Sequence, residues 1–541
     1  MKYIPLIACA LTLASSHALA QDADDAPAIV MKADRVLIYP QRMDLQGDES
    51  LLDVIMMYPD LMQSGWASLV SSYNVRIDNA PVNMDNRIFL SQLKAKLVSK
   101  VQICDNTAVA KGTVGMNRVM DINMLRNDES LHGHVQGEIG TDNMATASTE
   151  LRLGTEKTDV YATASYSYAD QDDVIGQEER VFAHMTNWFT PHDRLLSYFC
   201  QQYFDTKDYT SGSKIGTDQQ RYLIRERYFH NFNDVGTELL IVAGYQRTNT
   251  PRVVTSDDEV AVNTTSQDAL LGIVELNTPL GSNLSMMLGW EGDFNLNKYC
   301  MADGSQKYNQ MNNDAYLQLN LTAGPMLITL GDRPMFYHYS VGDKGYNDAR
   351  NNFQASVIGK ISNRQQAQIA FHRKFSNPSF AFYGKVTDDE WQAKQETLTA
   401  SYINEVKASY TYTRKSFSLT VATYLLGKEN ANDEWKLQAA ASFTRGIFAI
   451  TGGANYHDVE GADNNYATFH LEPRLAFAHG WQLSARGVIG TSNATLAHDE
   501  DSYLELQLAK QIGEHVCISA DWHDISDSDH SAAMAKLQFK F

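Results

Sequence analysis

From about Ser130 to the C-terminus, polar and apolar residues alternate along the chain. The alternation is clear in segments such as ASTELRLGT, DVYATASYSYA, AYLQLNLTA, EVKASYTYT and SFSLTVATYLL. Successive side chains of a β-strand point to opposite faces, so each segment predicts a strand with one apolar and one polar face. The polar faces are too polar for a dry core, which favours lipid on one side of the strands and a wet lumen on the other.

The connections between these segments alternate in length. Short turns are predicted near 191–193, 279–282 and 323–325, and longer polar segments such as QRTNTPRVVTSDDEVAVNTTSQ and NKYCMADGSQKYNQMNN lie between them. Bacterial outer-membrane barrels alternate short periplasmic turns with longer outer loops, and counting between the connections gives about 22 strands. The sequence therefore predicts an all-β transmembrane barrel of antiparallel strands over residues 130–541.

The final segment, AAMAKLQFKF, predicts the closing strand of this barrel. Leu537, Phe539 and Phe541 share one face, which we expect to meet lipid. Lys536 and Gln538 share the other face and are expected in the lumen. Because an open sheet edge in a membrane leaves backbone groups without partners, the last strand should pair with the first.

Residues 32–126 have a different pattern and predict a small mixed α/β unit. DESLLDVIMMYPDLM has apolar residues near helical spacing, and YNVRIDNAPV predicts a strand, a turn and a second strand. A barrel of about 22 strands has a lumen wide enough to need a stopper. We therefore expect the unit to be a plug domain inside the barrel.

The first residues indicate export. Residues 1–20, MKYIPLIACALTLASSHALA, have an early lysine, an apolar run and a small-residue cleavage pattern, which together are typical of a secretory signal peptide. Residues 21–31 then form a short periplasmic segment. After residue 20 no apolar run is long enough to predict a transmembrane helix.

The net charge and the cysteine pattern argue against some classes of function. The formal net charge of -20 opposes binding to nucleic acid. Beyond the signal segment, four cysteines remain at scattered positions without CxxC spacing, so neither a zinc site nor a disulfide framework is predicted.

Several stretches, in order, resemble segments of the TonB-dependent outer-membrane receptors. ESLLDVIMMYPDLM resembles their plug helix and contains Pro59, and YNVRIDNAPVN resembles their strand and turn around Ile77 and Asp78. VSKVQICDNTAVAKGTVGMNRVMDINM resembles the segment in which a strand is followed by a glycine-containing turn, matched by Gly112 and Gly115, and a closing strand. The resemblance implies that Pro59, Ile77, Asp78, Gly112 and Gly115 belong to motifs of a plug domain.

A further likeness lies within the barrel. Residues 375–378, FSNP, resemble the receptors' Phe-Arg-x-Pro loop, and Asn404-Glu405-Val406 resembles the opening of the strand that follows it. The chain departs from the family pattern at Asn377, where the family has arginine, and at Asn79, where it has glycine. The plug is also shorter and the outer loops are briefer than is usual for the family.

The resemblance implies a TonB-dependent receptor in the outer membrane of a Gram-negative bacterium, which takes up a scarce nutrient through a plugged barrel. The nutrient would be a metal chelate, cobalamin or a glycan. The implied partners are outer-membrane lipid, the energy-coupling protein TonB and a small nutrient ligand. Ala28, Ile29, Val30 and Met31 are the candidate TonB-binding residues, because an extended segment can pair with TonB by strand addition.

Two other interpretations stay open at this point. One is a passive diffusion porin whose N-terminal unit is only a periplasmic appendage. The other is a degenerate, receptor-like barrel with a structural or interaction role.

Enzymatic and metal sites are not predicted. No nucleophile elbow, phosphate loop or HExxH is present, so no catalytic residue or cofactor is assigned. His132 and His134 share a strand face, and Asp521, His523 and His530 lie near one rim, but the imidazole pair has no third ligand nearby in the sequence. We interpret these residues as ordinary polar positions of a barrel.

Overall fold

The computed structural model describes most of the barrel and part of the N-terminal unit. The described residues are 28–31, 35–43, 50–55, 73–77, 80–81, 90, 93, 95–104, 118–125, 131–141, 143–171, 174–209, 214–232, 236–256, 259–301, 304–362, 364–376, 401–414, 417–429, 432–445, 447–459, 466–477, 480–492, 503–513, 516–523 and 532–540. Among them, no helix has the length and apolar character needed to cross a bilayer.

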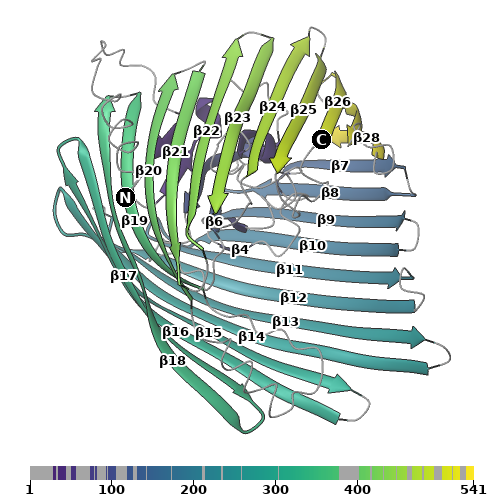
Figure 1. Cartoon of the computed structure of the whole chain (residues 1–541). Coiled ribbons are helices and arrows are strands. Elements are labelled where there is room, and N and C mark those ends of the chain that lie inside the picture. The colour runs from purple at the N-terminus through teal and green to yellow at the C-terminus, as the bar shows by residue number, and fades with distance from the viewer. Residues whose placement is uncertain are drawn as a thin grey trace.

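Residues from Leu131 onward form one closed antiparallel barrel of 22 strands (Figure 1). Each strand pairs with its neighbours in sequence, and the last pairs with the first, as Gln538 opposite Gln136 illustrates. The predicted fold class, strand number and closure are thus confirmed. Short turns at 280–283 and 324–325 also agree with the sequence prediction.

The strands differ in length around the barrel. The long ones are β10 (Val174–Trp188), β11 (Asp193–Asp208), β12 (Lys214–Asn231), β13 (Glu238–Ser256), β14 (Glu259–Pro279), β15 (Leu284–Met301), β16 (Gly304–Ala323), β17 (Met326–Val341) and β18 (Lys344–Ser362). The shorter ones are β7 (Leu131–Gly140), β8 (Ala145–Gly154), β9 (Thr158–Gln171), β19 (Gln365–Ser376), β20 (Ser401–Arg414), β21 (Phe417–Lys428), β22 (Glu434–Arg445), β23 (Phe448–Val459), β24 (Tyr466–Phe477), β25 (Trp481–Ser492), β26 (Tyr503–Ile512), β27 (Val516–His523) and β28 (Ala532–Lys540).

The long strands correct one sequence expectation. Residues 246–267 and 297–313 were predicted as long polar connections, yet most of each segment continues the β13–β14 and β15–β16 hairpins. The prediction was wrong because it located strands by apolar alternation. Cross-strand backbone hydrogen bonds form equally well where both faces of a hairpin are polar.

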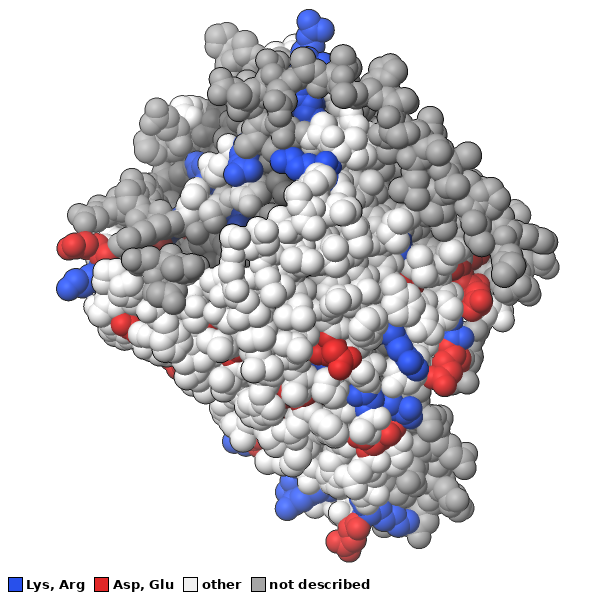
Figure 2. Space-filling model, turned by 90° about the vertical axis from the view of Figure 1, so that its left-hand side faces the viewer, with Lys and Arg blue, Asp and Glu red and all other residues white. Residues whose placement is uncertain are grey.

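The outer face of the barrel is apolar along its middle. Leu537 and Phe539 of the last strand are 42% and 49% exposed on this face, as predicted, whereas the inward Lys536 forms an ion pair with Glu138 at 2.9 Å. Figure 2 looks onto the side that is at the left of Figure 1 and shows a broad area with few charged side chains, although some acidic atoms lie near the middle of the view. This distribution suits a wall surrounded by hydrocarbon.

The N-terminal residues form a separate six-stranded sheet with the order β1-β2-β5-β6-β3-β4. Its strands are β1 (Ile29–Met31), β2 (Arg35–Ile38), β3 (Tyr73–Ile77), β4 (Ala80–Pro81), β5 (Val98–Cys104) and β6 (Arg118–Met124), accompanied by η1 (Pro40–Arg42), α2 (Leu51–Ile55) and η3 (Ala95–Leu97). In Figure 1 this purple unit lies within the barrel. Its apolar side chains, such as Ile38, Leu51 and Ile77, are completely buried.

Candidate functional site: the lumen around the N-terminal sheet

The barrel wall over β9–β12 holds the N-terminal sheet by apolar contact. Tyr161, Phe182, Tyr198, Cys200 and Leu223 project inward from these four strands and belong to the same buried cluster as the core of the sheet. We call these five residues the apolar wall. They are at most 3% exposed, and the Phe182 ring packs edge-on against Tyr161 and Tyr198, with centroid separations of 5.9 and 5.0 Å. Burial of these aromatic and aliphatic side chains stabilises the contact between the apolar wall and the sheet and does not require one exact geometry.

A buried group of charges lies beside the apolar wall. Asp121 on β6 is completely buried and pairs in register with Arg76 on the parallel strand β3. Both act electrostatically on Arg227 of β12, attractively for Asp121 and repulsively for Arg76. Arg152 of β8 donates a hydrogen bond to the carbonyl oxygen of Leu125, where β6 ends. The sheet and the wall therefore share electrostatic as well as apolar contacts.

The wall over β15–β17 contains its own buried ion network. Arg333 donates to Asp314 at 2.6 Å and to Glu291 at 2.9 Å, and its guanidinium lies 5.2 Å from the ring centre of Tyr316. These charged side chains are less than 10% exposed. Because unpaired buried charges are costly, the network fixes the relative positions of three neighbouring strands.

The inner face of β20–β24 is lined differently, by small and polar side chains. Six of them, all buried, define what we call the polar track: Ser409, Thr411, Thr420, Gln438, Asn455 and Thr468. Their cross-strand contacts are weak hydrogen bonds, such as Thr411 to Thr420 at 3.3 Å and Asn455 to Thr468 at 3.4 Å. This part of the wall presents mainly hydrogen-bonding groups to the lumen, although the buried ring of Tyr424 also lies on it, 5.1 Å from Lys407 Nζ.

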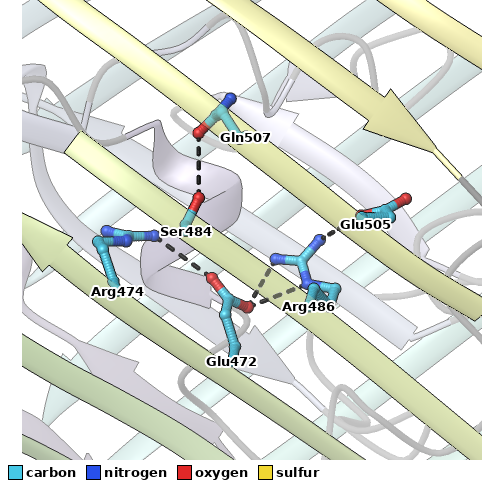
Figure 3. A network of polar contacts seen from close by, with 6 residues as sticks. All are labelled: Glu472, Arg474, Ser484, Arg486, Glu505 and Gln507. Atoms are coloured by element: carbon cyan, nitrogen blue, oxygen red, sulfur yellow. Dashed lines mark hydrogen bonds and ion pairs between the residues drawn. The ribbon is translucent and has the colours of Figure 1, made fainter. Parts of the chain in front are cut away.

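A row of paired charges crosses the inner face of β24–β26, next to the polar track (Figure 3). Arg486 donates to Glu472 at 2.7 and 3.0 Å and forms an ion pair with Glu505 at 3.5 Å. Arg474 reaches the same Glu472 at 3.4 Å. We call Glu472, Arg474, Arg486 and Glu505 the charge row. All four are 11–16% exposed, so they keep some contact with solvent.

The structure describes only some of the predicted site residues. Of the TonB-binding candidates, Ala28 precedes β1, and Ile29, Val30 and Met31 form that strand, at one end of the sheet order and antiparallel to β2. Ile77 is buried at the end of β3. Pro59, Asp78, Gly112 and Gly115 lie outside the described residues.

The remaining candidates give no composite site. His132 and His134 lie in β7, Asp521 and His523 end β27, and His530 is outside the described residues. Within the part of the chain that the structure describes, no group of three or more histidine, cysteine, aspartate or glutamate residues is placed to hold a metal ion.

Sequence reasoning missed the apolar wall, the Arg333 network and the charge row. Each member is an ordinary inward position of an alternating strand. The sequence does contain one signal: charged residues two positions apart in a strand, such as Glu472 and Arg474, lie on the same face. Their partners depend on the register between strands, which alternation alone does not define.

Comparison with known proteins identifies the fold. Neither a protein-family model nor a curated protein matches the sequence. Solved structures do match: the copper transporter OprC has a TM-score of 0.71 at 9% identity, with 95% of this chain and 99% of that chain covered. The siderophore receptor PiuA of Acinetobacter baumannii has a TM-score of 0.69 at 12% identity, with 98% and 100% covered. The siderophore receptor PirA of Pseudomonas aeruginosa has a TM-score of 0.67 at 13% identity, with 95% and 100% covered.

These matches extend over nearly the whole length of both chains, although few residues are identical. They include the 22-stranded wall and the N-terminal residues that lie within it. The chain therefore has the fold of the TonB-dependent outer-membrane receptors, the family that its sequence motifs resemble.

Proposed function

We propose that this protein is a TonB-dependent receptor of the Gram-negative outer membrane, which takes up a scarce nutrient through a plugged barrel. Residues 1–20 would direct export, and residues 32–126 would be the plug. The observation that supports the proposal most is the buried cluster joining the N-terminal sheet to the barrel wall. A lumen enclosed by so many strands would leak without such a stopper.

The class of nutrient is proposed from the structural neighbours. Those described above are named as siderophore receptors and a copper transporter, which favours a metal chelate. A cobalamin or a glycan remains compatible with a polar lumen. Neighbours of this kind are receptors and transporters, so the proposed role is transport rather than catalysis.

TonB coupling is proposed for residues 28–31. β1 is an edge strand of the N-terminal sheet, paired to β2 over only three residues. An edge strand with so few ladder contacts can pair with an added strand or be pulled away at modest cost. Force applied there would act on the sheet without acting directly on the barrel.

Deleting residues 28–31 tests the coupling. We expect the producing bacterium to stop growing when iron, cobalamin or a glycan is the limiting nutrient. The heat-modifiable migration of the protein on gels, which reports barrel assembly, should stay unchanged. A control replaces Gln41 by alanine, since that exposed side chain hydrogen-bonds to the backbone carbonyls of Lys96 in η3 and Val98 in β5 and lies outside β1. Unchanged growth of the deletion strain in every condition would instead support a barrel that no longer transports.

Electrical conductance separates the proposal from a diffusion porin. The intact purified protein in a planar bilayer should carry no large steady current. A large steady current would show an open lumen and would support the porin.

A further inference from the structure

One acidic side chain lies in an apolar part of the outer face of the barrel. Asp332 on β17 is exposed and shares this face with Leu330 and Phe336, which are 48% and 55% exposed. It pairs in register with Leu317 of β16 and Phe353 of β18, which are 40% and 37% exposed. A carboxylate is therefore surrounded by side chains that face hydrocarbon. β17 and β18 lie at the left of Figure 1, the side that Figure 2 shows.

Asp332 lies within the depth of the membrane and not at its edge. β17 begins at Met326, after the short turn at 324–325, and Asp332 is six residues further along the strand. A strand that rises about 3.3 Å per residue and tilts by about 45° gains about 2.3 Å of height per residue. Asp332 is thus about 14 Å above that end of β17, inside an apolar band that is about 25 Å tall in such barrels.

The hydrogen bond that Asp332 accepts does not balance its charge. The side-chain amide of Asn351 on β18 donates to Asp332 Oδ1 at 2.7 Å. Because an amide is neutral, this bond leaves the carboxylate with its full negative charge. Charged side chains that face lipid are costly, and they usually pair with a group of opposite charge. The position therefore favours a partner that brings a cation to this depth.

A cation lies two strands away on the same outer face. Arg373 of β19 is exposed and pairs in register with Phe353, which pairs in turn with Asp332. Its guanidinium lies 4.1 Å from the ring centre of Tyr402 on β20. Arg373 is eight residues from Gln365, where β19 begins, so it lies about 18 Å above the same end of the barrel. Two opposite charges thus flank Phe353, about 10 Å apart across the sheet.

We propose that the outer wall over β16–β20 is an interface between two copies of this chain in the membrane, with a two-fold axis along the membrane normal at Phe353. Such an axis keeps the height of each residue and exchanges left for right. Asp332 of each copy would therefore face the partner's Arg373, and both contacts would be identical. The arginine side chain is long enough to bridge the height difference of about 5 Å between the two positions.

The residues around the axis suit such a contact. The two Phe353 rings would meet at the axis, and the Phe371 ring, whose centre is 6.3 Å from that of Phe353 in the same chain, would extend the apolar area on each side. Pairing would remove both the carboxylate of Asp332 and the guanidinium of Arg373 from lipid. A second copy supplies the acid and the cation together, which a partner with only one of the two charges would not.

Glu226 on β12 provides a matched comparison. It is also exposed on the outer face, and Ser197 donates a hydrogen bond to it at 2.7 Å. Its row across the sheet continues through neutral residues only, with Met185 and Ser197 on one side and Ala243 and Gly272 on the other. A second copy seated on that row would bring no cation to Glu226. We therefore expect no interface there.

Disulfide cross-linking in membranes tests the interface. The full-length protein, with its native cysteines replaced by alanine, carries Phe353→Cys, and outer membranes that contain it are oxidised with copper phenanthroline. We expect a cross-linked dimer on non-reducing gels, because the axis brings the two thiols together. Ala243→Cys, beside Glu226, is the control and should give at least about five-fold less dimer, since thiols more than a few ångströms apart cannot bond.

Charge reversal tests the ion pairs. Asp332→Arg places two cations opposite each other in both contacts, so the dimer yield from Phe353→Cys should fall at least about five-fold. Adding Arg373→Asp re-creates both pairs in the reverse sense and should restore the yield. Glu226→Arg should leave it unchanged. Heat-modifiable migration on gels checks the assembly of each variant, and Asp332→Asn, which removes only the charge, should lower the yield if Asp332→Arg does not assemble.

Four results overturn the inference. They are no dimer from Phe353→Cys, equal dimer yields from Phe353→Cys and Ala243→Cys, a yield that the loss of the Asp332 charge does not lower, and a yield that the double reversal does not restore. Equal yields would mean that the barrels only collide at random in the membrane. A cross-linked product of another mass would assign this wall to a different membrane protein and would contradict the proposal of a second copy.

Discussion

The two inner walls of this barrel are built from the same alternating strands, yet they hold different side chains. The β9–β12 wall presents the apolar wall residues, which join the core of the N-terminal sheet, alongside buried polar side chains such as Arg180, His184 and Arg227. The β20–β26 wall presents hydroxyls, amides and paired charges, in contacts of 3.3 Å or longer within the polar track. Alternation therefore determines which residues face the lumen, but the type of inward residue determines which of them join the core of the N-terminal sheet.

The largest effect is expected on the apolar wall. Phe182→Ala removes a completely buried ring at the centre of the cluster and should destabilise the protein by about 3–5 kcal/mol. The loss should appear as faster hydrogen exchange in β5 and β6 of the N-terminal sheet. Phe371→Ala, at a position 37% exposed on the outer face of β19, is the control and should leave that exchange unchanged.

A smaller effect is expected in the charge row. Arg486→Gln removes a charged partner from both Glu472 and Glu505 and leaves Glu472 only its longer contact with Arg474, so we expect a loss of about 1–3 kcal/mol in the free energy of unfolding. Urea unfolding of the protein in detergent measures this change in the free energy of unfolding. Hydrogen exchange in β5 and β6 should not change, and an effect there as large as that of Phe182→Ala would remove the distinction between the walls.

The smallest effect is expected in the polar track. Thr420→Val keeps the shape of the side chain and removes only the 3.3 Å contact with Thr411, so the cost should be about 1 kcal/mol or less. The same urea titration measures the change. A loss above that of Arg486→Gln would mean that the track is a tightly bonded network and not a set of weak hydrogen bonds.

Much of the barrel could be predicted from the sequence, for a specific physical reason. Hydrocarbon on one side and a polar lumen on the other force an alternation of two, which revealed the strand number, the closure and the outward position of Leu537 and Phe539. Where long hairpins extend with both faces polar, as in β13 and β14, that signal disappears. The sequence prediction accordingly assigned strand residues to connections.

The lumen could be predicted only in outline. That Glu472 and Arg474 share a face follows from their spacing, but the contact of Glu472 with Arg486 depends on how β24 and β25 align. Likewise, Phe182 resembles any inward residue of a barrel strand. Its role as an anchor appears only once the N-terminal sheet packs against it.

The most direct test of the central claim, that the N-terminal unit closes the barrel, compares planar-bilayer conductance of the intact protein with that of a protein lacking residues 28–125. We predict no steady current from the intact protein and a large steady conductance from the truncated one, since a barrel of 22 strands without a stopper encloses a wide aqueous path. Equal, large currents from both proteins would contradict the account.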